Sequence, residues 1–215
     1  MMETTPYRPS DPRRRERGQG LLELVVILPV LLILMVGVAE IGVGLRTYLL
    51  VLNANREAAR FAARGRYEDG RVAERVISAG GVVQLGGTAV PFLRPSGTEP
   101  NTGIIITHLE MDPTGTELTR TVYYTGVVPG SGGGVLELTE DDTRLDVGGV
   151  LDRQSAVQAE VGVLREAESY EPVNNHLAAV EVYFAHESLM LSSLVPIPDP
   201  WPMYARTVMR VTQGR

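Results

Sequence analysis

The chain has 215 residues, of which 44 % are hydrophobic and 21 % charged, and its formal net charge is -6. This length suits one domain of roughly 100–150 residues plus an additional segment, and the apolar content excludes a disordered chain. No stretch carries the basic excess that phosphate binding needs, so we expect no nucleic-acid partner. The absence of cysteine excludes disulfides and thiolate-bound metal centres.

A polar leader precedes one long apolar segment. Residues 1–18, MMETTPYRPSDPRRRERG, are rich in proline and arginine, and we expect no fixed structure there. Residues 21–45 are apolar apart from Glu23 and Glu40. As a helix they would be about 37 Å long, which exceeds the ~30 Å hydrocarbon core of a bilayer. They are therefore predicted to span a membrane once, with the lipid bilayer as the first partner.

The flanking charges predict the orientation of this span. A cluster of arginines lies immediately before it, whereas Arg46 and Arg56 follow it more sparsely. Because positive residues favour the cytoplasmic side, the N-terminus is predicted to be cytoplasmic. Residues 66–215 would then form an extracytoplasmic head domain.

An ordinary secretory signal peptide is the alternative for this region. Its apolar part usually covers about 7–15 residues and ends in small residues. The apolar run here is longer and contains a carboxylate. Patterns of small residues at 37–39 and 42–44 keep the alternative open.

Glu23 is the most informative residue of the span, because a carboxylate near the end of a membrane helix is costly without a partner. A basic leader ends at Gly18, four residues follow, and Glu23 comes next, near the start of the apolar helix. This layout resembles a type IV prepilin, which implies cleavage by a prepilin peptidase between Gly18 and Gln19. The new α-amino group has a pKa near 8 and is largely protonated at neutral pH, so it could pair with Glu23 and set the register between subunits. Alternatively, Glu23 lies among lipid headgroups and needs no partner.

The N-terminal region combines Arg-Gly-Gln-Gly at 17–20, Glu23, Pro29 within the apolar run, Glu40 and Gly42. This combination resembles the N-terminal signature of TadE-like proteins, the pseudopilins of tight-adherence pilus systems. A looser likeness extends to residues 55–65, 180–200 and 204–211, whereas residues 70–170 resemble no family that we can name. The resemblance implies an inner-membrane pilin-like subunit whose partners are prepilin peptidase and other pilin or pseudopilin subunits.

Two departures refine that resemblance. Major tight-adherence pilins have a tyrosine after the glutamate and a very short mature chain, whereas this chain has Leu24 and is long. It therefore resembles a minor or accessory subunit. Relatives of the TadG type share much of the signature and are not all cleaved.

Two glycines and a glutamate share one face of the predicted span. Gly37, Glu40 and Gly44 fall within about 60° of one another on a helix. This is typical of a helix–helix contact face in a membrane, although Glu40 near the outer interface could instead reach water. Pro29 removes one backbone hydrogen bond and is predicted to kink the helix.

The remaining pattern predicts an α+β, pilin-like fold. The helix of residues 19–65 would leave the membrane, end near Gly65 and pack on a mainly antiparallel sheet of about four strands, with one or two further helices. We expect the proline-rich segment 189–201 to be a buried crossover or, alternatively, a docking or membrane-proximal surface. The other predicted elements are helices at 68–79 and 150–168, strands at 103–112, 117–126, 177–186 and 204–211, a turn at 113–115 and a loop at 126–150.

No constellation of residues predicts catalysis. Two of the histidines, His176 and His186, flank one predicted strand and would be about 30 Å apart. His108 belongs to no known ligand pattern, and the acidic residues of 140–146 lack calcium-loop spacing, so a solvated loop is favoured over a loose cation site. We find no nucleophile with an evident base. We therefore expect no catalytic residue, no metal and no cofactor, and a protein that is not an enzyme.

Three functions remain open from the sequence. The first is a minor pseudopilin that acts in assembly of a tight-adherence pilus or secretion apparatus after loss of residues 1–18. The second is an uncleaved, membrane-anchored extracytoplasmic scaffold or binding protein. The third is a secreted protein that loses about 40 residues.

Overall fold

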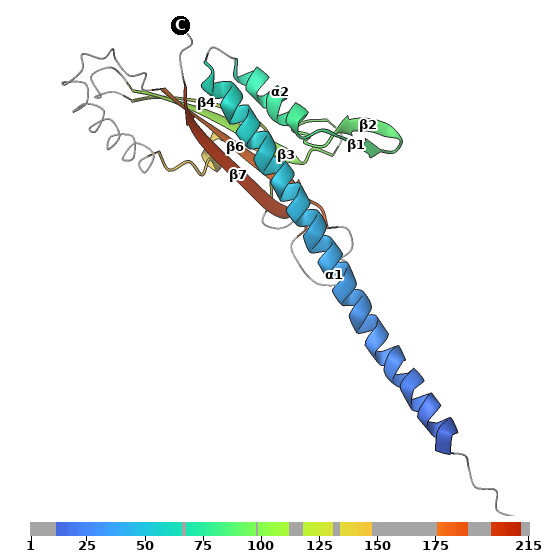
Figure 1. The fold of residues 1–215 in the computed structure, drawn as a ribbon. Helices are drawn as coiled ribbons and strands as arrows, with labels where there is room; N and C mark the ends of the chain where they lie inside the picture. Colours follow the sequence, from blue (N-terminus) through green and yellow to red (C-terminus); the bar gives the residue numbers. More distant parts are fainter. Residues whose placement is uncertain are drawn as a thin grey trace, which may run out of the picture.

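The computed structural model describes residues 12–65, 68–97, 99–111, 118–130, 134–147, 176–188 and 199–211. One long helix carries an α+β head on its C-terminal half, while its N-terminal half extends away from the head (Figure 1). The elements in chain order are α1 (Pro12–Ala63), α2 (Asp69–Ala79), β1 (Val82–Leu85), β2 (Thr88–Pro91), β3 (Thr102–Met111), β4 (Leu118–Pro129), β5 (Val135–Glu137), the short 3-10 helix η1 (Glu140–Asp142), β6 (His176–His186) and β7 (Trp201–Arg210).

The head contains a five-stranded antiparallel sheet in the order β5-β4-β3-β6-β7. The predicted hairpin is confirmed as β3 and β4, and β6 lies on the other side of β3. The α+β class with a long apolar N-terminal helix is therefore confirmed, with five strands in place of about four. The additional strand, β5, lies within the segment that was predicted to be a loop.

A separate hairpin of β1 and β2 was missed by the sequence interpretation. Leu85 pairs with Thr88, and the two residues between them, Gly86 and Gly87, have φ values of 55° and 81°. Two consecutive positive φ angles are what a two-residue type I′ turn requires, and glycine adopts them without steric cost. The Gly-Gly pair therefore predicts a two-residue hairpin turn from the sequence alone.

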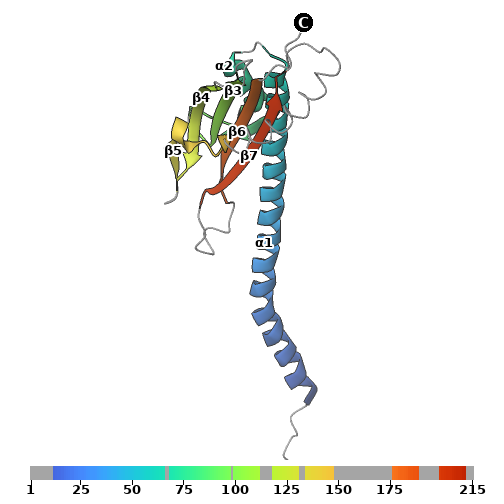
Figure 2. The ribbon, with the colours of Figure 1, turned by 90° about the vertical axis from the view of Figure 1, so that its left-hand side faces the viewer.

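Helix α1 begins earlier than the sequence predicted. Its first residue is Pro12, so the prediction of no fixed structure is wrong for 12–18. Proline is well tolerated in the first turn of a helix, and the arginine and glutamate residues that follow have high helix propensity. The helix continues through Pro29, and its N-terminal part is inclined to the remainder (Figure 2).

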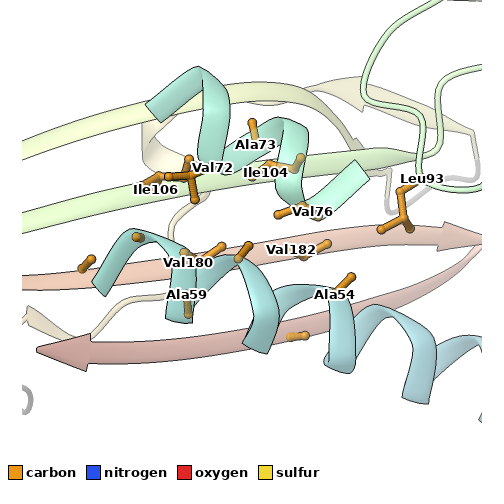
Figure 3. Close-up of a cluster of buried hydrophobic side chains, with 14 of the residues drawn as sticks. Ala54, Ala59, Val72, Ala73, Val76, Leu93, Ile104, Ile106, Val180 and Val182 are labelled. Atoms are coloured by element: carbon orange, nitrogen blue, oxygen red, sulfur yellow. The ribbon is translucent and has the colours of Figure 1, made fainter. Parts of the chain in front are cut away.

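The main core lies between the two helices and one face of the sheet. The C-terminal half of α1 covers β6 and β7, and α2 packs beside it (Figure 3). The buried stripe of α1 consists largely of alanines, which lets the helix axis approach the sheet closely; the valines and isoleucines of the sheet then fill the interface. The stripe and its partners include Val51, Ala54, Ala58, Ala59, Ala62, Val72, Val76, Ile104, Ile106, Val180 and Val182.

The opposite face of the sheet is covered by the segment around η1, which a buried carboxylate holds in place. Glu181 on β6 is fully buried. It accepts hydrogen bonds from the Thr143 hydroxyl, the Tyr204 hydroxyl and the backbone N–H of Arg144, the last at 3.0 Å. Burial, followed by the bond to Glu181, raises the pKa of Tyr204 well above its usual value. Both carboxylate oxygens therefore have donors, as a buried charge requires.

Several predicted features lie outside the described residues. They are the turn at 113–115, the helix at 150–168 and most of the proline-rich segment, 189–198. The last predicted strand is confirmed as β7, although it begins at Trp201 and not at Tyr204.

Removing the Tyr204 hydroxyl tests the importance of the Glu181 network. Tyr204→Phe should lower the free energy of unfolding by about 1.5–3 kcal/mol, because a donor to a buried carboxylate is lost. The measurement is urea denaturation of the full chain in detergent micelles. Tyr124→Phe is the matched control, because Tyr124 is 47 % exposed and should tolerate the change. Equal stability of both variants would contradict the proposed role of the network.

Candidate functional site

The N-terminal half of α1 is an apolar surface that the head leaves uncovered. Within the described residues, one helix, the Gly20–Ala63 part of α1, is long and apolar enough to cross a membrane. Every side chain from Leu21 to Met35 is exposed, Leu31 by 54 %. Such an apolar face is stable in lipid but not in water. The part of α1 that begins at Leu21 is therefore a candidate single-pass membrane anchor.

The predicted processing and register residues lie at the start of this anchor. The backbones of Gly18 and Gln19 belong to α1, but the burial of these two residues is not described. Glu23 lies in the exposed apolar stretch. Cleavage after Gly18 and pairing of Glu23 remain predictions.

The predicted helix-packing residues have different environments. Gly37 is half-buried, and a Cβ added there would meet no atom within 4 Å. Glu40 is only 2 % exposed. Gly44 is also buried, and its Cβ position lies 3.8 Å from Nε2 of His186 and 3.9 Å from the ring of Trp201. The face carrying Glu40 and Gly44 is thus covered by this chain's own head. Contact of the same face with another membrane helix remains a prediction.

His186 and Trp201 close the membrane-proximal end of the head. They are paired across β6 and β7, and their rings meet edge-on with centroids 6.2 Å apart. Burial lowers the pKa of His186, while the nearby Glu40 carboxylate opposes that shift. A buried imidazole thus lies in the electrostatic field of a buried carboxylate, at the position where α1 enters the head.

The close contact at Gly44 predicts a position-specific effect of side-chain size. Gly44→Leu should lower the free energy of unfolding by about 1–3 kcal/mol, because the added side chain must displace His186 or Trp201. Gly42→Leu is the matched control, since a Cβ at Gly42 meets nothing within 4 Å. Denaturation of both variants in micelles measures the difference. Equal tolerance of the two substitutions would show that the head does not pack on α1 at this turn.

A polar cluster that the sequence interpretation missed lies at the opposite end of the head. Nδ1 of His108 on β3 is 2.8 Å from Nε2 of His176 on β6, and Nε2 of His108 is 2.7 Å from Oδ1 of Asp69 at the start of α2. The Glu110 carboxylate is 3.6 Å from the remaining ring nitrogen of His176. These side chains line a cavity of about 420 Å³ with the end of α1. Only the pairing of β3 with β6 could have revealed this cluster.

The geometry of the two rings limits how many protons they hold. When Asp69 is ionised, His108 donates through Nε2, so His108 Nδ1 accepts the N–H of His176. Protonating both rings would place two N–H groups against each other. Burial and the neighbouring His108 lower the pKa of His176. The pair is therefore arranged to resist full protonation.

This arrangement predicts a pH-dependent stability. Below the ordinary histidine pKa of about 6.5, the unfolded chain binds more protons than the folded one, because the folded pKa values of His176 and His186 are lowered. The free energy of unfolding should therefore fall as pH decreases from 7 to 5. His176→Gln should reduce this loss while leaving the contribution of His186. Denaturation in micelles at both pH values measures it, and an unchanged slope in the variant would contradict the assignment.

The acidic segment 140–146 has a structural use. The Asp142 carboxylate accepts hydrogen bonds from the backbone N–H and hydroxyl of Thr139, at 2.7 and 2.8 Å, which caps η1. Across the described ranges, no group of three or more His, Asp or Glu side chains is arranged to hold a metal ion.

A known family matches the helix. Residues 18–60 match the model of a family described as TadE-like protein. Residues 18–60 of this chain are therefore TadE-like. The match begins at Gly18 and ends within the part of α1 that the head covers, so it confirms the resemblance seen in the N-terminal motifs. No curated protein and no solved structure matches the chain.

The TadE-like match covers 43 of the 215 residues and lies wholly within α1. It covers the anchor, Glu23, the buried Glu40 and most of the alanine stripe. The strands of the head and the three histidines lie beyond it. The TadE-like segment thus combines the exposed half of α1 with the surface on which the head folds.

Proposed function

We propose that this protein is a minor, TadE-type pilin-like subunit that acts in assembly of a tight-adherence pilus or related secretion apparatus. It is anchored in the inner membrane by α1, with a cytoplasmic N-terminus and the head outside the cytoplasm. Prepilin peptidase processes it after Gly18. Its partners are the lipid bilayer, the peptidase and other pilin or pseudopilin subunits.

The observation that carries the proposal is the division of α1 into two halves. The first half exposes apolar side chains on all sides, whereas the second half is one wall of the α+β head. A helix divided in this way can lie in lipid before assembly and against neighbouring helices afterwards, while the head keeps its fold. The TadE-like match covers both halves, which supports a pilus-related use of this arrangement.

The position of Glu23 supports assembly through the processed N-terminus. Glu23 lies in the apolar, exposed stretch, where an unpaired carboxylate is costly once water is removed. Cleavage after Gly18 would create an ammonium group about one helical turn away. The two charges can neutralise each other within a chain or between neighbouring chains, so a shifted neighbour would leave a charge unpaired.

A second surface above the anchor supports contact with other subunits. Leu45 and Leu49 are 58 % and 48 % exposed on the side of α1 away from the sheet. They line a groove of about 500 Å³ together with Arg46 and Ala79, the last residue of α2. Exposed leucines along a helix are typical of a surface that another helix covers.

The processing test compares membranes with and without a prepilin peptidase. Intact mass and N-terminal sequencing should show a chain that begins at Gln19 only when the peptidase is present. Gly18→Val should prevent the cleavage, because the bulky β-branched side chain replaces the residue that the prepilin motif places at the cut. A chain that keeps residues 1–18 with active peptidase would contradict the processed-pilin proposal and favour the uncleaved membrane scaffold.

Glu23→Gln separates processing from assembly. The variant should still be cleaved but should no longer co-purify with other pilus subunits, because an amide cannot neutralise the new ammonium group. Glu57→Gln is the control, since Glu57 is exposed on the head-bearing half of α1 and pairs with Arg75. Normal co-purification of Glu23→Gln would overturn the role assigned to Glu23.

A further inference from the structure

We propose that the membrane-proximal end of the head is seated on the phospholipid headgroups of the membrane that α1 crosses. This surface comprises His186 at the end of β6, Trp201 at the start of β7, and the Glu40–Gly44 turn of α1. The inference rests on the anchoring part of the proposed function and adds a specific contact between the head and the lipid surface.

The length of the uncovered helix sets the height of the head above the membrane. The head first buries α1 at Glu40, whereas Val38, two residues earlier, is 72 % exposed. Below Glu40, the stretch from Gly20 to Ala39 is exposed except at Val36 and Gly37, which are half-buried. It is about 30 Å long at 1.5 Å per residue. This equals the ~30 Å hydrocarbon thickness that a helix of about 20 residues spans. The lower end of the head therefore meets the bilayer where the headgroups begin.

The covering of Glu40 fits that position. A carboxylate at the top of a membrane helix is costly if it faces acyl chains. Here the head shields the carboxylate from lipid, because Glu40 is only 2 % exposed. The His186 ring covers the next turn of α1, with Nε2 3.8 Å from the Cβ position of Gly44. The apolar side chains of α1 immediately below remain open to lipid. On the side of α1 that the head does not cover, Ile41 and Leu45 above Glu40 are also exposed. The head therefore borders the apolar anchor on one face of the helix.

The side chains at this border suit a headgroup environment. Trp201 is half-buried, with its ring against α1 and His186. Tryptophan concentrates at membrane interfaces because its ring is apolar and its N–H is polar. On the outer side of α1, Arg46 is exposed about one and a half turns above Glu40. Its long side chain can reach lipid phosphates while its stem stays on apolar surface.

The chain carries its own probe for this contact, since Trp201 is its single tryptophan. The full chain is reconstituted into phosphatidylethanolamine–phosphatidylglycerol vesicles that contain phosphatidylcholine brominated either near the headgroup or near the acyl-chain end. Trp201 fluorescence should be quenched at least twofold more by the shallow bromines than by the deep ones. Acrylamide in the water should quench it less than it quenches a fully exposed tryptophan.

Two further probes make the result interpretable, both in the Trp201→Phe background. Leu31→Trp places the ring in the middle of the proposed span and should be quenched best by the deep bromines. Thr119→Trp places it at an exposed position at the other end of the sheet, where Thr119 pairs with Glu110, and should respond to acrylamide alone.

Each outcome has one meaning. If Leu31→Trp is quenched but Trp201 behaves like Thr119→Trp, the head stands clear of the lipid and this inference is overturned, while anchoring remains. If Trp201 is quenched best by the deep bromines, the head enters the hydrocarbon and the headgroup contact is also overturned. If Leu31→Trp is not quenched by either lipid, the anchoring part of the proposed function fails as well.

Discussion

The contact between the alanine stripe of α1 and strands β6 and β7 determines the rest of the structure. Ala54, Ala58 and Ala62 leave no side chain beyond Cβ, so the helix backbone lies close to the sheet and the sheet's branched side chains fill the space. This contact joins the head to a helix whose side chains from Leu21 to Met35 are exposed in the part of the chain that the structure describes.

This attachment gives the head two different ends. The end near Glu40 is closed by aromatic and imidazole rings against the helix, at the border of the apolar anchor. The other end holds the His108–His176 pair above an open cavity, where α1 stops and α2 begins. Between them, the Glu181 network fastens a second layer to the outer face of the sheet. Packing therefore forms the centre of the head, and ionisable groups concentrate at its ends and on its outer face.

Much of the architecture could be predicted because it depends on local patterns. The apolar run gave the anchor, alternation gave the β3–β4 hairpin, and the helical spacing of Val72 and Val76 gave α2. The early start of α1 at Pro12 was missed, because the proline and arginine content of the leader was taken to indicate no fixed structure, although several of its residues favour a helix. The β1–β2 hairpin was missed although Gly86 and Gly87 signal it. Both features depend on a few neighbouring residues, namely the helix propensity of the leader and the Gly-Gly turn, so both could have been predicted from the sequence.

By itself, the sequence determined a single apolar span, its basic leader, the position of Glu23 and an α+β head, because periodicity and composition act over a few neighbouring residues. Only the tertiary structure decided that Glu40 and Gly44 lie under the chain's own head, and that His108 meets His176. These contacts join residues far apart in the chain. They depend on which strands pair and on where the head begins along α1, and both follow from packing of the whole domain.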